Sequence, residues 1–263
     1  MTGRGYMSFL VGLLGGIFGG FVGLGGGAIM IPFMVDFLKL DQHKAHGSNL
    51  VTIVFTGMAG AIAYGLGGAI NVTAAALLAI PAILTTRAGC HFAHSLPAWK
   101  LKRSFGYFLI FMSLLLLAKP YLPGIHVLKA GWPQSAVLIL TGVFLGFLSG
   151  MMGVGGGIIM VPAMVLLTGF TQHTAQGTSL LAMVPIGSVG AYTHWKLGNV
   201  KTDILAGMIA GILIGATIGG TFAHYFSEGV LRVAFAAVLI WTGARYVRAK
   251  EPLDAPDGAV CAP

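Results

Sequence analysis

The sequence predicts an all-α, polytopic membrane protein built from two inverted five-helix repeats. Each repeat is expected to begin with a glycine-tipped helical hairpin that crosses only half of the bilayer. Three observations predict this fold: an almost uncharged composition, a duplication of the first half of the chain in the second, and a triple glycine that precedes a short apolar segment in both copies.

The composition does not suit a water-soluble domain. Of the 263 residues, 56% are hydrophobic and 8% are charged, whereas a soluble domain carries about 25% charged residues to cover its surface. Long segments such as 53–86 and 130–195 contain no Asp, Glu, Lys or Arg, and a helix crosses a bilayer with about 20 apolar residues. Because these segments are continuously apolar rather than alternating, they indicate membrane-spanning helices and not the strands of a barrel.

The net charge of +8 would also suit a nucleic-acid surface, but the distribution of Lys and Arg favours a topology signal. With the N-terminus in the cytoplasm and the first two helices forming a hairpin, most of the basic residues fall on the cytoplasmic side: Arg4, Lys39, Lys44, Lys100, Lys102, Arg103, Lys196, Lys201, Arg245, Arg248 and Lys250. This bias predicts a multi-pass protein of the bacterial inner membrane with both termini in the cytoplasm. Cys90 and Cys261 indicate neither a disulfide framework nor a metal site.

The second half of the chain repeats the first at a constant offset of 130 residues, as Gly12 and Gly142 illustrate. The matches include the glycine rows, Gln-His-x-Ala-x-Gly after each hairpin and Gly-x-x-Phe-Ala-His near each end. The apolar run at residues 1–22 has a counterpart in the second half, so it belongs to the fold and is not a signal peptide. We predict repeats at residues 1–125 and 126–250, followed by a disordered cytoplasmic tail at 251–263.

The apolar runs and their breaks predict ten helices. Their expected ranges are 6–22, 28–38, 46–66, 72–94 and 104–118 in the first half and 134–152, 158–168, 175–195, 202–224 and 230–247 in the second. The halves carry charge on opposite loops: Lys39 and Lys44 have no basic counterpart near Phe170, and Lys196 has none in the loop at 66–70. Matching loops therefore face opposite sides, which predicts an inverted repeat, a common architecture of secondary transporters.

The sequences Gly23-Leu-Gly-Gly-Gly-Ala28 and Gly153-Val-Gly-Gly-Gly-Ile158 are the predicted hairpin tips. The segment after the first tip is about 16 Å long as a helix, which is half the thickness of the hydrocarbon core, so the tip should lie inside the membrane. Its free N–H groups and positive dipole end would suit an anion. The predicted backbone donors are Gly25, Gly26, Gly27, Gly155, Gly156 and Gly157.

Two other interpretations of the glycines are open. In the first, the triple glycines serve tight packing alone, which is the favoured interpretation for the glycine rows at four-residue spacing. The first tip also fits a dinucleotide-binding fingerprint, although no strand precedes it.

Polar residues inside the predicted spans also favour an anionic cargo, because carboxylates, which a cation carrier needs, stand only near helix ends. Arg87 is the one basic residue well inside a span, and it either contacts the cargo or extends to the interface. Some neutral side chains could line the site, cap helices or form hydrogen bonds between helices: Ser48, Asn49, Thr52, Thr178 and Ser179. We expect His43, His94, His173 and His224 to anchor helix ends at the interface rather than to carry protons.

With these motifs in place, the chain resembles the TauE/SafE family, the sulfite exporter or toluene sulfonate uptake permease family. The resemblance covers about residues 8–247 and rests on G-x-x-G-x-G-G-G-x-x-x-x-P at Gly20–Pro32 and Gly150–Pro162, with the segments at 47–50 and 177–180. It implies transport of sulfite, organosulfonates or related small anions across a bacterial inner membrane.

The predicted function is a secondary transporter, acting as an exporter, of such an anion by alternating access, with no cofactor and no enzymatic activity. The alternatives are a passive anion channel of the same fold, an intramembrane hydrolase that uses Ser48 or Ser179 with a histidine, and a structural scaffold. The cargo and the lipid bilayer are the expected partners, and nucleic acid is not.

Overall fold

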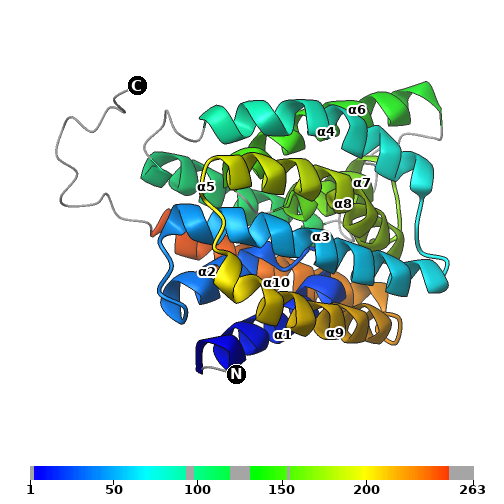
Figure 1. The fold of residues 1–263 in the computed structure, drawn as a ribbon. Coiled ribbons are helices and arrows are strands. Elements are labelled where there is room, and N and C mark those ends of the chain that lie inside the picture. The colour runs from blue at the N-terminus through cyan, green and yellow to red at the C-terminus, as the bar shows by residue number, and fades with distance from the viewer. Residues whose placement is uncertain (1–2, 93–97, 119–130, 153–154, 249–263) are drawn as a thin grey trace.

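The computed structural model describes residues 3–92, 98–118, 131–152 and 155–248, which form a bundle of helices without a strand in these ranges (Figure 1). The helices of the first half are α1 (Gly3–Val22), α2 (Gly27–Asp36), α3 (Gln42–Leu66), α4 (Val72–Phe92) and α5 (Ala98–Ala118). Those of the second half are α6 (Trp132–Met152), α7 (Gly157–Leu167), α8 (Gln172–Lys196), α9 (Leu205–Ala223), which the short 3₁₀ turn η2 (Thr202–Ile204) precedes, and α10 (Glu228–Val247). The predicted tail at 251–263, His94 and Gly153 lie outside the described residues.

The ten helices of the described residues confirm the all-α prediction, and two of their limits differ from the expected ones by four residues or more. α3 begins at Gln42 rather than at residue 46, because the Asp41 side chain accepts a hydrogen bond from Lys44 N and starts the helix earlier. α5 begins at Ala98 rather than at residue 104. Its first turns carry basic residues, which end an apolar run in the sequence but continue a helix easily.

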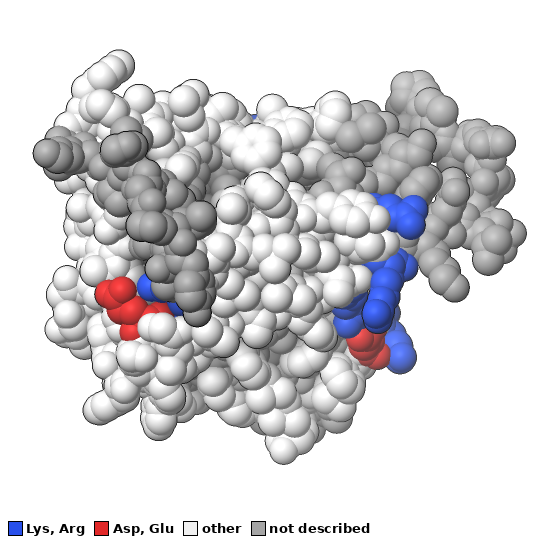
Figure 2. Space-filling model, turned by 180° about the vertical axis from the view of Figure 1, so that it is seen from behind, with Lys and Arg blue, Asp and Glu red and all other residues white. Residues whose placement is uncertain are grey.

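Within the described ranges, six helices are long and apolar enough to span a membrane, namely α1, α3, α4, α6, α9 with its preceding turn, and α10. α8 has 25 residues but is not among the six, because Gln172, Gln176 and Ser179 place polar groups along it. These three side chains are buried inside the bundle rather than exposed to lipid. Figure 2 shows that charged residues gather at two opposite ends of the face in view, with an uncharged belt between them.

The helices pair across the two halves. α1 packs along α9 and α6 packs along α4, each pair parallel: Gly12 lies against Met208 and Gly16 against Ile212, and in the second pair Gly142 lies against Leu78. The glycine rows thus serve close backbone packing, as the packing interpretation predicts. α3 with α8 and α5 with α10 are the other main contacts, and both pairs are antiparallel.

The short helices α2 and α7 lie inside this framework. Every residue of α7 from Gly157 to Leu166 is buried. In α2, Gly27 and the residues from Ile29 to Pro32 are buried as well. A buried helix of 10 or 11 residues spans only about half of a hydrocarbon core. The two glycine tips that start these helices are therefore placed within the bundle.

Candidate functional site

Both hairpin tips have the same backbone geometry. Gly26 caps α2 with φ of 80° and Gly156 caps α7 with φ of 80°. In each tip this glycine's carbonyl accepts bonds from the next helix, from Ile29 N and Met30 N at Gly26 and from the equivalent residues at Gly156. The left-handed conformation is one that glycine adopts without steric cost, which explains why the sequence keeps a glycine at this position in both copies.

The two tips meet each other at the middle of the bundle. A methyl group built on Gly157 of the second tip would lie 2.9 Å from Gly23 O and 3.1 Å from Leu24 Cα of the first. Ile53, at the middle of α3, contacts the positions of both Gly25 and Gly155. The positive ends of α2 and α7 therefore converge on one central region, where their dipoles favour a negative charge.

Two apolar side chains fill the space between the tips. Ile53 on α3 and Met183 on α8 are both fully buried, and they occupy equivalent positions at the offset of 130. A methyl group on Gly25 would lie 2.7 Å from Met183 Sδ, and Gly157 also faces the Met183 side chain. The chain has therefore adopted a conformation in which the centre is closed by side chains.

Ser179 joins α8 to the first tip. Its hydroxyl lies 2.8 Å from Gly23 O and 2.8 Å from Gln176 O, so it is bonded to the backbone at the tip itself. The equivalent residue on α3, Asn49, is fully buried, and the Thr52 hydroxyl donates to its carbonyl at 2.7 Å. The structure thus brings Ser179 to the tip.

Ser48 and Thr178 hold loops. Ser48 Oγ accepts a bond of 2.9 Å from Lys201 N, and Thr178 Oγ1 accepts one of 3.0 Å from Asn71 N. The two bonds are equivalent at the offset of 130, and each fixes the start of the helix that follows α8 or α3. Each hydroxyl is thus hydrogen-bonded to the backbone of a loop in the other half of the chain.

Gln176 is a candidate site residue that sequence reasoning missed. It is fully buried against the first tip, where a methyl group on Gly23 would lie 2.6 Å from its Cβ and Cγ. The Tyr64 hydroxyl lies 2.9 Å from Gln176 Oε1, and Gln176 Nε2 has no hydrogen-bond partner among the described residues. A buried amide without a partner is costly, so a group that accepts its N–H bonds would be stabilised there.

The signal that would have identified Gln176 is weak. It stands inside the repeated Gln-His-x-Ala-x-Gly motif at the position where the first copy has His46. A comparison of the two halves that counts only identical residues does not single out a position where the residues differ. Ile53 and Met183 were missed for a different reason, since an apolar residue in a membrane helix gives no sign of whether it faces lipid or the centre.

Arg87 lies apart from the tips. It is exposed, and it lines a recess between α4 and α8 at the end of the bundle where both helices finish. Of the histidines expected at helix ends, His173 and His224 lie at the opposite end of the bundle, where their rings stack with centroids 5.8 Å apart and His224 Nε2 lies 3.3 Å from Ala63 O. No group of three or more His, Cys, Asp or Glu residues that could hold a metal ion occurs in the described part of the chain.

Together these features define a class: a multi-pass helical membrane protein in which two helical hairpins meet at the centre. Comparison with known proteins agrees with that class. The family model described as "Sulfite exporter TauE/SafE" matches residues 8–246, so the chain belongs to the TauE/SafE family.

Its relatives include the probable membrane transporter protein YunE of Bacillus subtilis, 29% identical over 220 residues that cover 74% of this chain and 81% of that protein. A second B. subtilis protein, the probable membrane transporter protein YjnA, is 24% identical over 90% of this chain and 98% of its own length. A probable membrane transporter protein of Xylella fastidiosa is 27% identical, with 90% and 92% covered. No solved structure matches the chain.

Proposed function

We propose that the protein is a secondary transporter that exports sulfite, an organosulfonate or a related small anion across the bacterial inner membrane, with both termini in the cytoplasm. The observation that carries this proposal is the convergence of the two glycine tips beside Ile53 and Met183. The family description, sulfite exporter, supports the choice of a sulfur oxyanion. The described carboxylates support the sign of the cargo, because Asp36, Asp41, Asp203 and Glu228 all stand at helix ends and leave the centre without a negative charge.

In this proposal the cargo is bound by backbone N–H groups of the tips, at Gly25–Gly27 and Gly155–Gly157, and by neutral side chains near them. Gln176 Nε2 supplies a donor at the first tip, held in place by Tyr64. Ser179 contacts the first tip, and Asn49 and Thr52, buried on α3, are the proposed donors from the other half, while Ser48 and Thr178 act indirectly by fixing loops. A neutral set of donors desolvates at less cost than charged residues, and it still stabilises an oxyanion.

The proposal includes the inverted relation of the two halves and alternating access. The antiparallel packing of α3 on α8 and of α5 on α10, which are equivalent helices, supports an inverted repeat. Rocking one half against the other would separate Ile53 from Met183 first on one side and then on the other. The engagement of Ser48 and Ser179 with backbone groups supports transport over hydrolysis.

The test is sulfite flux in proteoliposomes carrying Gly25→Ala or Gly155→Ala. The matched controls are Gly68→Ala and Gly198→Ala, because these glycines have φ of 69° and 72° and a methyl group there meets nothing within 4 Å. All four variants bear the same backbone strain, about 1 kcal/mol, but only the tip variants crowd the proposed site. We expect sulfite flux to fall at least about 10-fold in the tip variants alone. Equal flux in tip and loop variants would remove the proposed site, and counter-flow of labelled sulfite would separate a carrier from a channel.

A further inference from the structure

A basic recess lies between the ends of α4 and α8, away from the tips. It encloses about 370 Å³ and is lined by Arg87, His91, Tyr192, Thr193, Lys196 and Leu197. Arg87 and His91 stand one turn apart on α4, and Tyr192 and Lys196 one turn apart on α8, so each pair shares a helix face. Four polar side chains from two helices thus surround one cavity.

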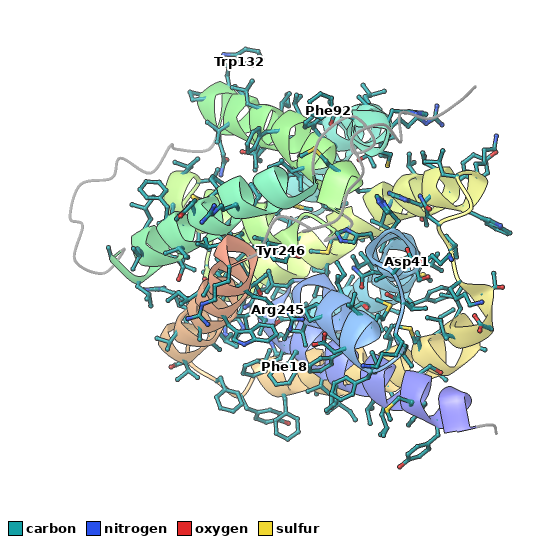
Figure 3. The ribbon with its side chains drawn as sticks, turned by 90° about the vertical axis from the view of Figure 1, so that its left-hand side faces the viewer. Phe18, Asp41, Phe92, Trp132, Arg245 and Tyr246 are labelled. Carbon is teal, nitrogen blue, oxygen red and sulfur yellow. The ribbon has the colours of Figure 1, made fainter. Side chains whose placement is uncertain are left out.

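The positive charge of this recess has no carboxylate to balance it among the described residues. The three described carboxylates at this end of the bundle are held by other bases: Asp41 by Lys44 at 3.2 Å, Asp203 by Lys201 at 3.6 Å and Asp36 by Arg245 at 3.0 Å (Asp41 and Arg245 are labelled in Figure 3). The carboxyl ends of α4 and α8 each contribute about half a negative charge, which offsets only part of the charge of Arg87 and Lys196. An anion is therefore favoured here.

The donors of the recess are partly preorganised. Lys196 Nζ lies 4.8 Å from the centre of the Tyr192 ring, which restricts the lysine to the side of the recess. The Thr193 hydroxyl already donates to Val189 O at 2.8 Å, so the remaining donors are Arg87, Lys196, His91 and the Tyr192 hydroxyl. A guanidinium and an ammonium on opposite walls suit a tetrahedral oxyanion with several acceptor oxygens.

The basic residues of the recess have no basic counterparts at the equivalent positions of the repeat. The residues equivalent to Arg87 and His91 are Thr217 and Thr221, and those equivalent to Tyr192 and Lys196 are Ile62 and Leu66. The tips, the loop-holding hydroxyls and the glycine rows are all duplicated, whereas this site is not. Its role is therefore separate from the duplicated machinery of the proposed transport and belongs to one end of the bundle only.

The surroundings of the recess are those of a membrane interface. Leu84 on α4 is 75% exposed and Trp195 on α8 is 67% exposed, so an apolar surface adjoins the recess and an aromatic ring stands beside its basic residues. Basic pockets between membrane helices at this depth are suited to phosphate-bearing headgroups. We propose that the recess binds a phosphate-type oxyanion, supplied either by the headgroup of an anionic phospholipid or by free phosphate.

The experiment compares the full chain with a double variant, Arg87→Gln with Lys196→Gln, and with a matched control, Lys44→Gln with Lys201→Gln. The control removes two positive charges from the same end of the bundle, outside the recess. Native mass spectrometry in detergent with added phosphatidylglycerol or phosphatidylcholine measures retained lipid. Thermal unfolding in lipid-free detergent with inorganic phosphate measures binding of the free ion.

If the source is lipid, the wild type and the control retain phosphatidylglycerol over phosphatidylcholine, and the double variant binds phosphatidylglycerol about 10-fold more weakly. If the source is the free ion, inorganic phosphate stabilises the wild type and the control but not the double variant. Equal behaviour of the double variant and the control in both measurements would overturn the proposal. Neither readout involves sulfite flux, so the outcome is independent of the proposed transport activity.

Discussion

The two halves of the protein share their backbone and differ in the side chains that back each tip. The first tip is faced by Gln176, which Tyr64 holds at 2.9 Å. At the offset of 130 the equivalents of Gln176 and Tyr64 are His46 and His194, both buried, with 9% and 4% of their surface exposed. Each pair takes one residue from α3 and one from α8. One pair is a glutamine with a tyrosine and the equivalent pair is two histidines, so the duplication preserved the tips while side chains around them diverged.

The largest effect should come from the features that the halves share. Gly16 and Gly146 each face the backbone of a helix in the other half, and a methyl group on Gly16 would lie 2.8 Å from Ile212 O. Gly16→Leu and Gly146→Leu should each destabilise the fold by about 3 kcal/mol or more, because backbone cannot move aside as a side chain does. Thermal unfolding in detergent measures this.

The control for the glycine rows is Gly229→Ala in the first turn of α10, where a methyl group meets nothing closer than 3.9 Å. This change should leave stability equal or raise it by about 0.5–1 kcal/mol through helix propensity. A large difference between Gly16→Leu and Gly146→Leu would show that the halves are not equivalent in packing.

The next effect concerns the central side chains. Ile53→Ala and Met183→Ala should each open the space between the tips and allow sulfite to leak without exchange. Each substitution should also lower the free energy of unfolding by about 2–5 kcal/mol. Leu231→Ala is the control, because Leu231 is fully buried in a separate cluster and its truncation should cost a similar amount. Passive efflux from liposomes measures the leak, and a leak as large in Leu231→Ala would contradict the role of Ile53 and Met183.

The difference between the two pairs predicts that the buried histidines contribute to transport. The double change His46→Gln with His194→Tyr gives their positions the residues found at 176 and 64, and it should lower sulfite flux. His173→Gln is the control, because His173 stacks on His224 at the other end of the bundle. Unchanged flux in the double variant would contradict a role of the two buried histidines in transport.

The smallest expected effect on stability concerns the N-caps of α3 and α8. Asp41 Oδ1 accepts from Lys44 N at 3.0 Å, and Thr171 Oγ1 accepts from Thr174 N at 3.1 Å, at equivalent positions. The bond from Lys44 N, assisted by the Lys44 charge, lowers the pKa of Asp41 below its usual range. A lowered pKa means that the Asp41 cap stabilises the fold above the ordinary aspartate value, near 3.9, and that this contribution is lost as the pH falls through the lowered pKa.

Thr171→Ala should therefore cost about 1 kcal/mol at any pH. Asp41→Thr keeps a cap and should remove only the stability that the wild type loses as the pH falls through the lowered pKa of Asp41. Thermal unfolding between pH 3 and pH 7 separates the two, and parallel curves for the wild type and Asp41→Thr would contradict the cap assignment.

The fold could be predicted further than the site. Charge-free segments and the offset of 130 predicted ten helices and two hairpins, because bilayer thickness and duplication both leave marks that a single sequence displays. The predicted starts of α3 and α5 were too late. A cap begins α3 before its apolar run, and basic residues form the first turns of α5. The inverted relation of the halves and the boundary near residue 125 stay predictions.

The candidate site was predicted in its backbone and only partly in its side chains. Triple glycines indicated the tips, whereas Gln176 stands where the repeat breaks, and Ile53 looks like any lipid-facing residue. Ser48 and Ser179 look alike in the sequence, yet one bonds a loop and the other a tip. Which partner a hydroxyl finds depends on helix rotation, and periodicity alone does not determine it.

The parallel pairing of α1 with α9 and of α6 with α4 also constrains biosynthesis. α1 leaves the ribosome first, but its permanent neighbour is complete only when residue 223 has been made. Until then the glycine face of α1 contacts lipid or the insertion machinery instead of α9. A chain cut between α5 and α6 would accordingly strand α1 and α4 without their partners, and the two fragments would have to be produced together to assemble.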